Sequence, residues 1–544
     1  MKHYLQSLRE TIIEHWDNKA LCDYHGDSFT FGEMYGQMKR LHLLFDRFGI
    51  KEGDKIAICG RNQARWGISF LAANSYRAVV VPILSDFTPD SICSILNHSE
   101  SVLLFTDAEI WKNMDKGNLQ SVKRVICLKD FSLLHGLEQD TLAFSEAEQA
   151  YCRKYPSDPS ARDVVLPDGN DSDLAIINYT SGSTGDPKGV MLRYECLSAN
   201  TEYAQNNIPC HMGDNILSIL PMAHMFGLEF EMLYPLCFGA TVNYLGKTPS
   251  PSLLLEAMQE IRPYLVIAVP MIFEKIYRNK LKPVLEKPSV RLLISIPGLR
   301  GIIFSRMRRT ISEAFGGRVR EFIMGGAAVN PEVEDFFKRI GLNFTVGYGM
   351  TEAAPLLAYS SWRTFAPHSC GRAIDCVKLR IDSENPETEV GEIQAKGISL
   401  FSGYFKNERA TKAAFTEDGW FSTGDLGLID RKGNVYIKGR SKSMLLSSNG
   451  QNIYPEEIEC IINSLDYVVE SLVVSRGSKL VALVQLDGKQ IRNGGADSEQ
   501  IANGIKLNVN SKVPVYSRLH NVEITSEPFQ KTPKLTIKRF LYNK

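Results

Sequence analysis

The 544-residue sequence lacks the features that mark several large protein classes. Lysine and arginine together number 62, and so do aspartate and glutamate. This balance argues against a protein that binds nucleic acid through its overall charge. The eleven cysteines are scattered singly and form no CxxC pair, a pattern that favours reduced thiols over a disulfide framework or a zinc site. No stretch reaches the roughly 18 apolar residues that a membrane span needs.

Targeting segments and repeats are also missing. The first residues, MKHYLQSLRETIIEHW, lack the unbroken apolar core of a signal peptide and indicate an amphipathic helix instead. Neither a repeat of 20–50 residues nor a low-complexity tract is present. We therefore expect a cytoplasmic protein of more than one domain. Peripheral contact with the inner face of a membrane stays open, as does the oligomeric state.

Short apolar runs alternate with helical patterns in the first part of the chain. Residues 55–60 and 78–84 predict buried strands, and residues 65–76 between them predict a helix. This order is typical of a parallel sheet with crossover helices. Residues 174–177 predict another buried strand, which runs directly into a polar loop. Loops at the carboxyl ends of such strands are where open α/β sheets bind ligands.

From about residue 370 the pattern changes to short strands bounded by turns, such as KLRID and NVYIKGR. The best domain boundary is GRSKS at 439–443, whose small and charged residues have no apolar face. We expect an α/β fold. A large N-terminal domain of parallel-type α/β subdomains, with a small β subdomain from about 370, would span residues 1–440, and an α+β lid would span residues 441–544.

The most informative stretch is YTSGSTGDPKGV at 179–190. Its glycines let the backbone approach a ligand and point successive N–H groups at one anion. Its hydroxyl groups add donors, and Lys188 adds a mobile positive charge. Such a loop suits a polyphosphate, although it is not the Walker loop, which needs glycine before its lysine and a hydroxyl residue after it. An ordinary surface linker is the alternative.

Six further motifs follow in order: LPMAHMFG at 220–227, GGAAV at 325–329, GYGMTE at 347–352, STGDLG at 422–427, GRSKS at 439–443 and KTPKLTIKR at 531–539. Together with the loop they resemble the adenylate-forming superfamily of acyl- and aryl-CoA synthetases, luciferases and adenylation domains, over nearly the whole chain. AVPMIFEKIY at 268–277 is most similar to the long-chain fatty acyl-CoA synthetases. The resemblance implies an ATP-dependent ligase that activates a fatty acid as acyl-adenylate and transfers it to CoA, releasing AMP and pyrophosphate.

The resemblance also implies a nucleotide site. GGAA and GYG would form the adenine slot, Tyr348 would cover the purine, and Asp425 and Arg440 would approach the ribose, although an Asp before or after Gly is often only a turn residue. Asn449 and Gly450 fall in a polar turn that would line the pantetheine channel. The implied ATP- and CoA-binding residues are Thr180, Ser181, Gly182, Ser183, Thr184, Gly185, Lys188, Gly325, Gly326, Ala327, Tyr348, Gly349, Asp425, Arg440, Lys442, Asn449 and Gly450.

The candidate catalytic set is Lys534, Thr351, Glu352 and His224, of which the last three are implied by the resemblance. Thr351 would contact the α-phosphate. Glu352 and Thr184 would hold Mg²⁺, which takes one or two protein oxygens together with nucleotide phosphates. Alternatively, Glu352 is a charge at a helix N-terminus. His224 would lie between the nucleotide and the acyl pocket, or simply in the core.

Two further assignments concern the lid. Lys442 falls where the superfamily has the hinge about which the lid turns between adenylation and thioester formation. The C-terminal loop departs from the family's Pro-x-Gly-Lys, whose lysine bridges carboxylate and α-phosphate, because aligning on Pro533 places Thr536 at that lysine. Lys534 is our first candidate to supply the missing charge and Lys538 the second. Otherwise the protein adenylates slowly or not at all.

The substrate and the partners are less constrained. Residues 228–245 are apolar enough to line an acyl tunnel, but an ordinary buried helix and strand would look the same. Residues 278–309 hold nine Lys or Arg and one acid, which suits an anionic membrane surface or a solvated basic face. We expect fatty acid, ATP, Mg²⁺ and CoA as ligands, and no nucleic acid.

Two other functions remain as alternatives. A carrier protein would replace CoA in fatty acyl-AMP ligases, which typically have an insertion before the lid. Residues 378–397 span this region without such an insertion, which favours CoA. A weakly catalytic relative that binds nucleotide or lipid is the second alternative, because of Thr536.

Overall fold

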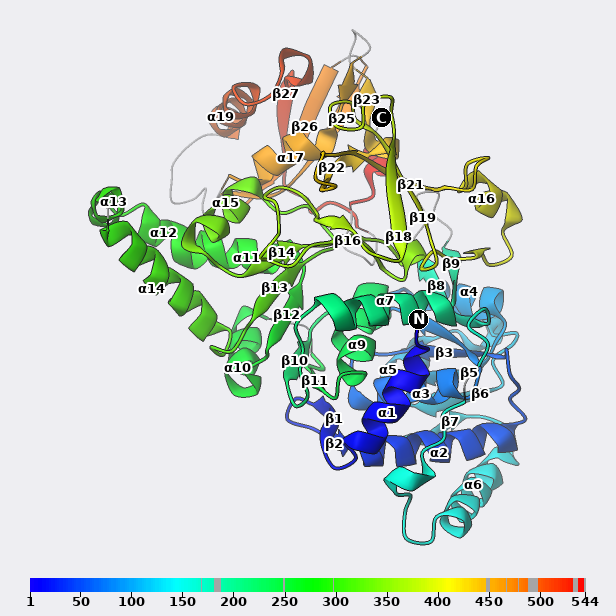
Figure 1. The fold of residues 1–544 in the computed structure, drawn as a ribbon. Coiled ribbons are helices and arrows are strands. Elements are labelled where there is room, and N and C mark those ends of the chain that lie inside the picture. The colour runs from blue at the N-terminus through cyan, green and yellow to red at the C-terminus, as the bar shows by residue number, and fades with distance from the viewer. Residues whose placement is uncertain are drawn as a thin grey trace.

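The computed structural model describes residues 1–167, 169–180, 187–247, 250–296, 298–446, 451–465, 467–477, 479–487, 498–531 and 537–542. Two large sheets with covering helices form the N-terminal part of the molecule, and an antiparallel sheet and a C-terminal α+β unit lie above them (Figure 1). This confirms the predicted α/β class.

The first large sheet has eight strands. In spatial order they are β20 (Gly403–Tyr404), β9 (Lys188–Arg193), β8 (Leu174–Thr180), β4 (Val79–Ile83), β3 (Lys55–Cys59), β5 (Ser101–Thr106), β6 (Arg124–Cys127) and β7 (Leu133–His135). The strands from β8 to β6 are parallel, and helix α3 (Ala64–Ser75) connects β3 to β4. The prediction of strand, helix and strand for residues 55–84 is therefore confirmed.

The second large sheet has seven strands. Their order is β14 (Phe344–Val346), β13 (Glu321–Met324), β12 (Leu265–Ala268), β10 (Asn215–Ser218), β11 (Thr241–Tyr244), β1 (Lys19–Asp23) and β2 (Ser28–Thr30), all parallel except β2. A second hydrophobic core lies between this sheet and the helices α10 (Pro251–Ile261), α14 (Leu299–Ala314) and α15 (Pro331–Ile340). Strands β10, β12, β13 and β14 each contribute buried side chains to this core.

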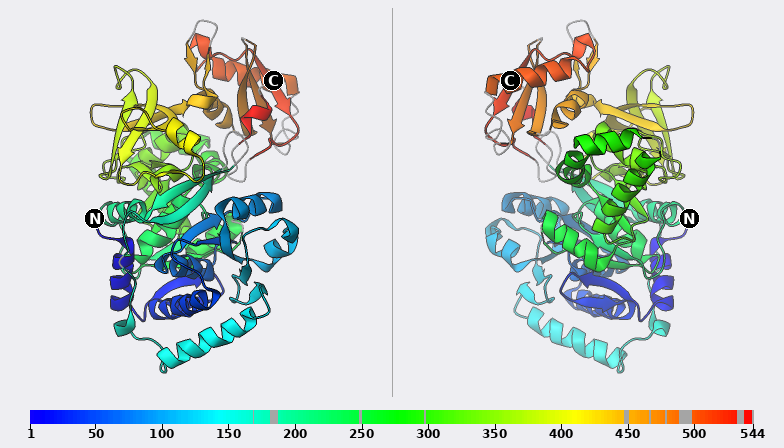
Figure 2. Two further views of the ribbon diagram at one scale, coloured as in Figure 1. Left: turned by 90° about the vertical axis from the view of Figure 1, so that its right-hand side faces the viewer. Right: turned by 90° about the vertical axis from the view of Figure 1, so that its left-hand side faces the viewer.

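The C-terminal third contains two smaller sheets besides the short pair of strands β23 (Leu445–Leu446) and β24 (Asn452–Ile453). The antiparallel strands β18 (Val377–Asp382), β19 (Gly391–Gly397), β21 (Phe421–Ile429) and β22 (Val435–Arg440) form one. The other consists of β25 (Val468–Arg476), β26 (Lys479–Leu486) and β27 (Asn521–Thr525), packed with helices α17 (Pro455–Asn463) and α19 (Ser498–Asn510). This last unit has its own hydrophobic core, separate from the three larger ones of the N-terminal part. Figure 2 shows it above the remainder of the molecule.

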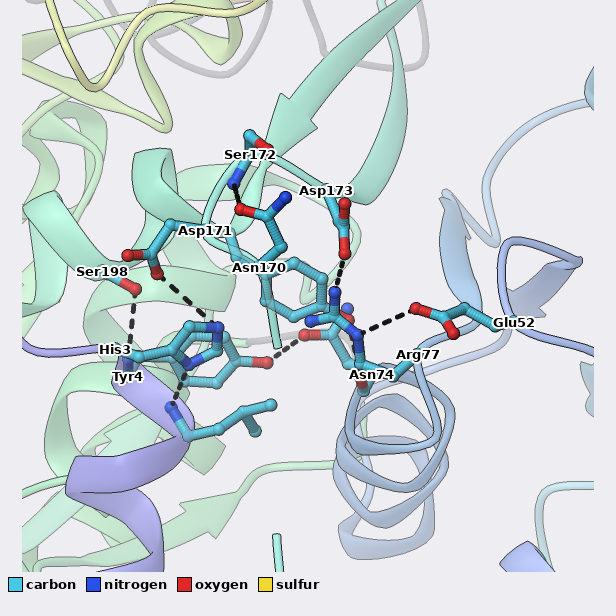
Figure 3. Close-up of polar contacts among 12 residues, drawn as sticks. His3, Tyr4, Glu52, Asn74, Arg77, Asn170, Asp171, Ser172, Asp173 and Ser198 are labelled. Atoms are coloured by element: carbon cyan, nitrogen blue, oxygen red, sulfur yellow. Dashed lines mark hydrogen bonds and ion pairs between the residues drawn. The ribbon is translucent and has the colours of Figure 1, made fainter. Parts of the chain in front are cut away.

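A polar cluster fastens the N-terminus to the first large sheet (Figure 3). The Tyr4 N–H, at the start of α1 (Tyr4–Glu14), donates to Ser198 Oγ on α7 (Tyr194–Asn207) at 3.0 Å. The Arg77 guanidinium pairs with Asp173 and lies 4.4 Å from the centre of the Tyr194 ring. These contacts join α1, α7 and the residue preceding β8, and so fix the strand that leads into the polar loop.

Two bulk expectations agree with the structure. All eleven cysteines are free thiols. Within the described ranges, no helix has the length and apolar character that a membrane crossing requires.

Candidate functional site

Strands β8 and β9 frame the predicted phosphate loop. Thr180, the last residue of β8, pairs with Lys188, the first of β9, and its hydroxyl donates to the Lys188 carbonyl at 3.5 Å. The loop ends are therefore held together by a ladder of two antiparallel strands. The loop residues Ser181, Gly182, Ser183, Thr184 and Gly185 lie outside the described residues, and their roles stay predictions.

Lys188 and Glu352 are brought together by a residue that the sequence did not single out. The Lys188 ammonium lies 4.9 Å from the centre of the Tyr404 ring, and the Tyr404 hydroxyl donates to Glu352 Oε1 at 2.9 Å. Burial and the neighbouring Glu352 carboxylate raise the pKa of Tyr404, so the phenol keeps its proton. A cation over an aromatic face and a hydrogen bond to a carboxylate are both favourable. Three distant segments thus meet at this tyrosine.

Tyr404 was missed for a physical reason. It lies in β20, a strand of two residues whose pairing with β9 is entirely tertiary. The local sequence SGYF does not distinguish it from a packing aromatic.

The predicted ribose and purine residues are also in contact. The Tyr348 hydroxyl donates to Asp425 Oδ2 at 2.8 Å, and Arg440 Nε lies 3.2 Å from Asp425 Oδ1. Asp425 and Arg440 are directly opposite each other on β21 and β22. Burial raises the pKa of Asp425, and the Arg440 guanidinium opposes that rise. One oxygen of this carboxylate therefore accepts a hydrogen bond from a phenol, and the other pairs with a guanidinium.

The two segments assigned to the adenine slot are adjacent. The Gly347 N–H donates to the last carbonyl of β13 at 2.8 Å, so GYGMTE begins beside GGAA. Gly325 packs against the Phe226 ring, where an added Cβ would lie 3.0 Å away. Gly326 has φ +80°, in the left-handed region that favours glycine. Gly326 and Ala327 are exposed, so both remain accessible at the end of the strand.

The other residues of these motifs differ in how far they are exposed to solvent. Gly349 is exposed and passes so near the Pro355 carbonyl that a Cβ would lie 2.1 Å from its oxygen. Thr351 begins the short helix η5 (Thr351–Ala353) and is half-buried, whereas Glu352 is 9% exposed. His224 is half-buried directly before α8 (Met225–Gly227).

The apolar segment after His224 is a π-helix, η3 (Leu228–Leu233), followed by α9 (Tyr234–Leu236) and β11. Its residues belong to the main hydrophobic core. Glu229 and Glu231 are fully buried among them, and burial raises the pKa of both carboxyls to about 8. A segment buried in this way is compatible with either reading of residues 228–245, and the acyl tunnel stays a prediction.

Lys442 lies in the exposed turn η6 (Ser441–Ser443), between β22 and the C-terminal unit. Side chains from two parts of the body contact helix α17 of the C-terminal unit. The Lys438 ammonium lies 3.2 Å from Glu457 Oε1, and the Arg278 guanidinium donates to the Asn463 carbonyl. Helix α17 therefore docks on two separate parts of the body. Asn449 and Gly450 lie outside the described residues.

The C-terminal loop is described only at its ends. Lys534 lies outside the described residues, as do Pro533 and Thr536. A bridge between Lys531 and Ile537 closes the loop. Arg539, another cation close to Thr536 in the sequence, forms its ion pairs within the C-terminal unit. It pairs with Glu459 and lies 3.5 Å from Glu456. Lys538 is half-buried, and its N–H donates to the Gln530 carbonyl at 2.9 Å.

Comparisons with known proteins agree with this arrangement. The sequence model of the AMP-binding enzyme family matches residues 8–405, and that of the AMP-binding enzyme C-terminal domain matches residues 442–544. The long-chain-fatty-acid–CoA ligase FadD15 of Mycobacterium tuberculosis is 27% identical over 86% of this chain and 79% of its own length. Long-chain-fatty-acid–CoA ligase 1 of Saccharomyces cerevisiae is 27% identical over 87% of this chain and 73% of its own.

Solved structures share the fold along almost the whole chain. The anthranilate CoA ligase AuaEII in complex with anthranoyl-AMP superposes with a TM-score of 0.81 at 18% identity, covering 99% of this chain and 96% of that one. ATP-bound MatB from Rhodopseudomonas palustris superposes with a TM-score of 0.76 at 22% identity, covering 99% of this chain and 98% of that one.

Proposed function

The chain belongs to the family of AMP-binding enzymes, and from this premise we propose that it is an AMP-forming ligase that joins a long-chain fatty acid to CoA. The observation that carries the proposal is the meeting of Lys188, Tyr404 and Glu352, together with the contact of Asp425 with Tyr348 from the same motif as Glu352. The first group suits phosphates and a metal ion, and the second suits a nucleoside. The long chain is supported by the named activity of relatives that are 27% identical.

In the first step the fatty acid carboxylate attacks the α-phosphorus of ATP, and pyrophosphate leaves. Lys188, at the loop, would neutralise the β- and γ-phosphates, and Thr351 would donate to the α-phosphate. Asp425, with Arg440 beside it, would accept from the ribose hydroxyls in place of the Tyr348 hydroxyl that it now accepts from. Holding the reactants in line and balancing the growing negative charge are the main catalytic effects available to such a site.

Mg²⁺ would be held by Glu352 and Thr184. Tyr404 occupies Oε1 of Glu352, and none of the residues that the structure describes donates to Oε2. One free carboxylate oxygen, with nucleotide phosphates and water, meets the usual demand of this ion. When bound, the metal would offset phosphate charge. Tyr404 orients the carboxylate by fixing its other oxygen.

In the second step the CoA thiolate attacks the acyl-adenylate carbonyl, and AMP leaves. We propose that residues 441–544 turn about Lys442 between the steps, relative to a body formed by residues 1–440. The separate core of the C-terminal unit supports this division. The short connection between β18 and β19 supports CoA over a carrier protein as acceptor.

The decisive experiment is ATP–pyrophosphate exchange with a panel of fatty acids of increasing length, followed by thioester formation with CoA. We expect exchange to depend on a long-chain acid, and Glu352→Gln to lower exchange and ligation more than tenfold, which corresponds to about 1.4 kcal/mol. Exchange without thioester formation would favour a carrier-protein acceptor. No exchange with any acid would favour the weakly catalytic alternative that Thr536 suggests.

A further inference from the structure

A helical arm projects from the second large sheet. It consists of α13 (Pro288–Ser295) and α14, and it extends to the left of the body in Figure 1 and faces the viewer in the right-hand view of Figure 2. One side of α14 is fixed, because Phe304 and Ile311 are buried and Ile303 and Met307 pack against the second core. The basic arm, as we name residues 288–296 and 298–314, is therefore packed on the body along one side of α14 and exposed on the other.

The exposed side carries apolar side chains that a globular protein usually buries. Five exposed large apolar residues fall within the basic arm: Leu292, Leu293, Ile296, Leu299 and Ile302. Leu292 is 67% exposed and Ile302 is 66% exposed. Exposed apolar groups gathered at one place indicate an interaction site, whereas single ones do not.

Arginines alternate with these apolar side chains along the arm. Arg291, Arg300 and Arg306 are exposed, and within the described part of the chain none of the three forms an ion pair with a carboxylate. Arg306 follows Ile302 by four residues, so both lie on the same side of α14. Further along, Arg309 has a partner, Glu313, at 3.5 Å. The outer end of the arm therefore combines apolar groups with uncompensated positive charge.

We propose that the basic arm docks the protein on the surface of an anionic lipid bilayer. The leucine and isoleucine side chains would enter the boundary between headgroups and acyl chains, and the guanidinium groups would bind lipid phosphates at the same depth. A nucleic acid would satisfy the arginines but leave the apolar side chains in water. A second copy of the chain would bring like charges together, which disfavours association. Docking places the protein at the surface where long-chain acids partition, but it does not depend on the ligase activity.

Vesicle sedimentation without substrates tests the proposal on the full chain. We expect the wild type to bind vesicles of phosphatidylglycerol and phosphatidylcholine in a salt-sensitive manner, and to bind pure phosphatidylcholine far more weakly. The variant R291Q/R300Q/R306Q should lose about fivefold in affinity per arginine, on the order of 100-fold in all, since one basic residue near such a surface contributes about 1 kcal/mol. L292S/I302S should also weaken binding, but without changing its salt dependence.

The matched control is R153Q/R162Q/R409Q, which removes three exposed arginines from other elements. It should bind as the wild type does, and circular dichroism should show that all variants fold. The proposal is overturned if the wild type does not bind anionic vesicles, or if the control loses as much affinity as the arm variant. It is also overturned if L292S/I302S converts a dimer to a monomer in sedimentation velocity without affecting vesicle binding, because the arm would then be a contact between copies.

Discussion

Tyr404 is placed between two side chains of opposite charge, and its two halves serve them separately. The ring faces the Lys188 ammonium, and the hydroxyl group donates to Glu352. A phenylalanine at this position would keep the ring and lose only the hydrogen bond. The two contributions can therefore be separated by one conservative substitution.

Tyr404→Phe should weaken the response to Mg²⁺ more than the binding of ATP. The phenol fixes one oxygen of Glu352, and a hydrogen bond to a charged group contributes about 1.5–3 kcal/mol. We expect exchange to fall about tenfold or more at limiting Mg²⁺ and to recover in part at high Mg²⁺. Titrating exchange with Mg²⁺ checks this, with Tyr404→Ala as the variant that also loses the ring. An unchanged Mg²⁺ titration would show that Tyr404 does not position Glu352.

The cation missing at Thr536 is the second question at this scale. We predict that Lys534 supplies it, because a lysine stem can reach from a shifted position if the loop bends. Lys534→Ala should nearly abolish adenylate formation and leave thioester formation from supplied acyl-adenylate almost intact, since only the first step builds negative charge at the α-phosphate.

Lys538→Ala is the comparison variant for that test. Lys538 is half-buried and its backbone is bonded to Gln530, so its alanine variant should retain most of the exchange activity. If both variants exchange at the wild-type rate, the charge comes from neither lysine.

At the scale of single elements, the π-helix η3 places two buried carboxyl groups, those of Glu229 and Glu231, in the main core. Glu231 accepts from Ser218 and from the N–H groups of Ile219 and Leu220. Glu229 accepts from Thr201 alone at 2.6 Å, and its Oε2 is buried without a donor among the described residues. The charged form of Glu229 is therefore the less well satisfied of the two.

Glu229→Gln should raise the thermal stability at pH 8 and leave it nearly unchanged at pH 4.5. Burial raises the pKa of Glu229 from 4.5 to about 8, so the folded state holds a proton that the unfolded state has lost between these values. The wild type must therefore lose stability as pH rises through this window. A neutral amide removes that loss, which we expect to exceed about 1 kcal/mol. Melting temperatures from pH 4.5 to 8 measure it, and equal slopes for both proteins would contradict the assignment.

The elements that the sequence predicted well are those whose burial is uniform. Strands β3, β4 and β8 read as unbroken apolar runs because both faces of the sheet are covered. The pairing of β20 with β9 was not predictable, since a strand of two residues has no period of its own. The π-helix was missed because residues buried on every side leave no periodic pattern.

The same contrast holds for the site. Asp425, Tyr348 and Glu352 were predicted from short motifs, whereas the contacts of Tyr348 with Asp425 and of Tyr404 with Glu352 depend on how distant segments meet. A motif fixes the residue types that a site needs, but it does not contain the packing that brings them together.

At the scale of the whole molecule, two of the polar contacts between the C-terminal unit and the body, among the residues that the structure describes, are made through helix α17. Arg278 reaches the Asn463 carbonyl, and Lys438 lies beside Glu457. Exposed or partly exposed pairs of this kind are individually weak, so they would oppose the proposed turn of the unit only slightly. In that proposed movement, the turn at Lys442 is the part of the chain that would change its dihedral angles.

Lys442→Pro should affect the two half-reactions unequally. Proline fixes φ near −65°, so the linker would favour one lid position, and only the step that uses this position would proceed at a normal rate. We expect the ratio of adenylation to thioester formation to change by at least tenfold, that is about 1.4 kcal/mol. The first step is followed by ATP–pyrophosphate exchange, and the second by release of AMP from supplied acyl-adenylate and CoA.

Lys442→Ala separates the backbone effect from the loss of the side chain. Alanine removes the ammonium but leaves φ free, so both half-reactions should stay within a few-fold of the wild type if the hinge acts through its backbone. Should the proline variant lower both steps in equal proportion, the lid does not turn at this residue. Should the alanine variant be as unequal as the proline variant, the ammonium group of Lys442 acts in one lid position, and the change of dihedral angles must occur at a neighbouring residue.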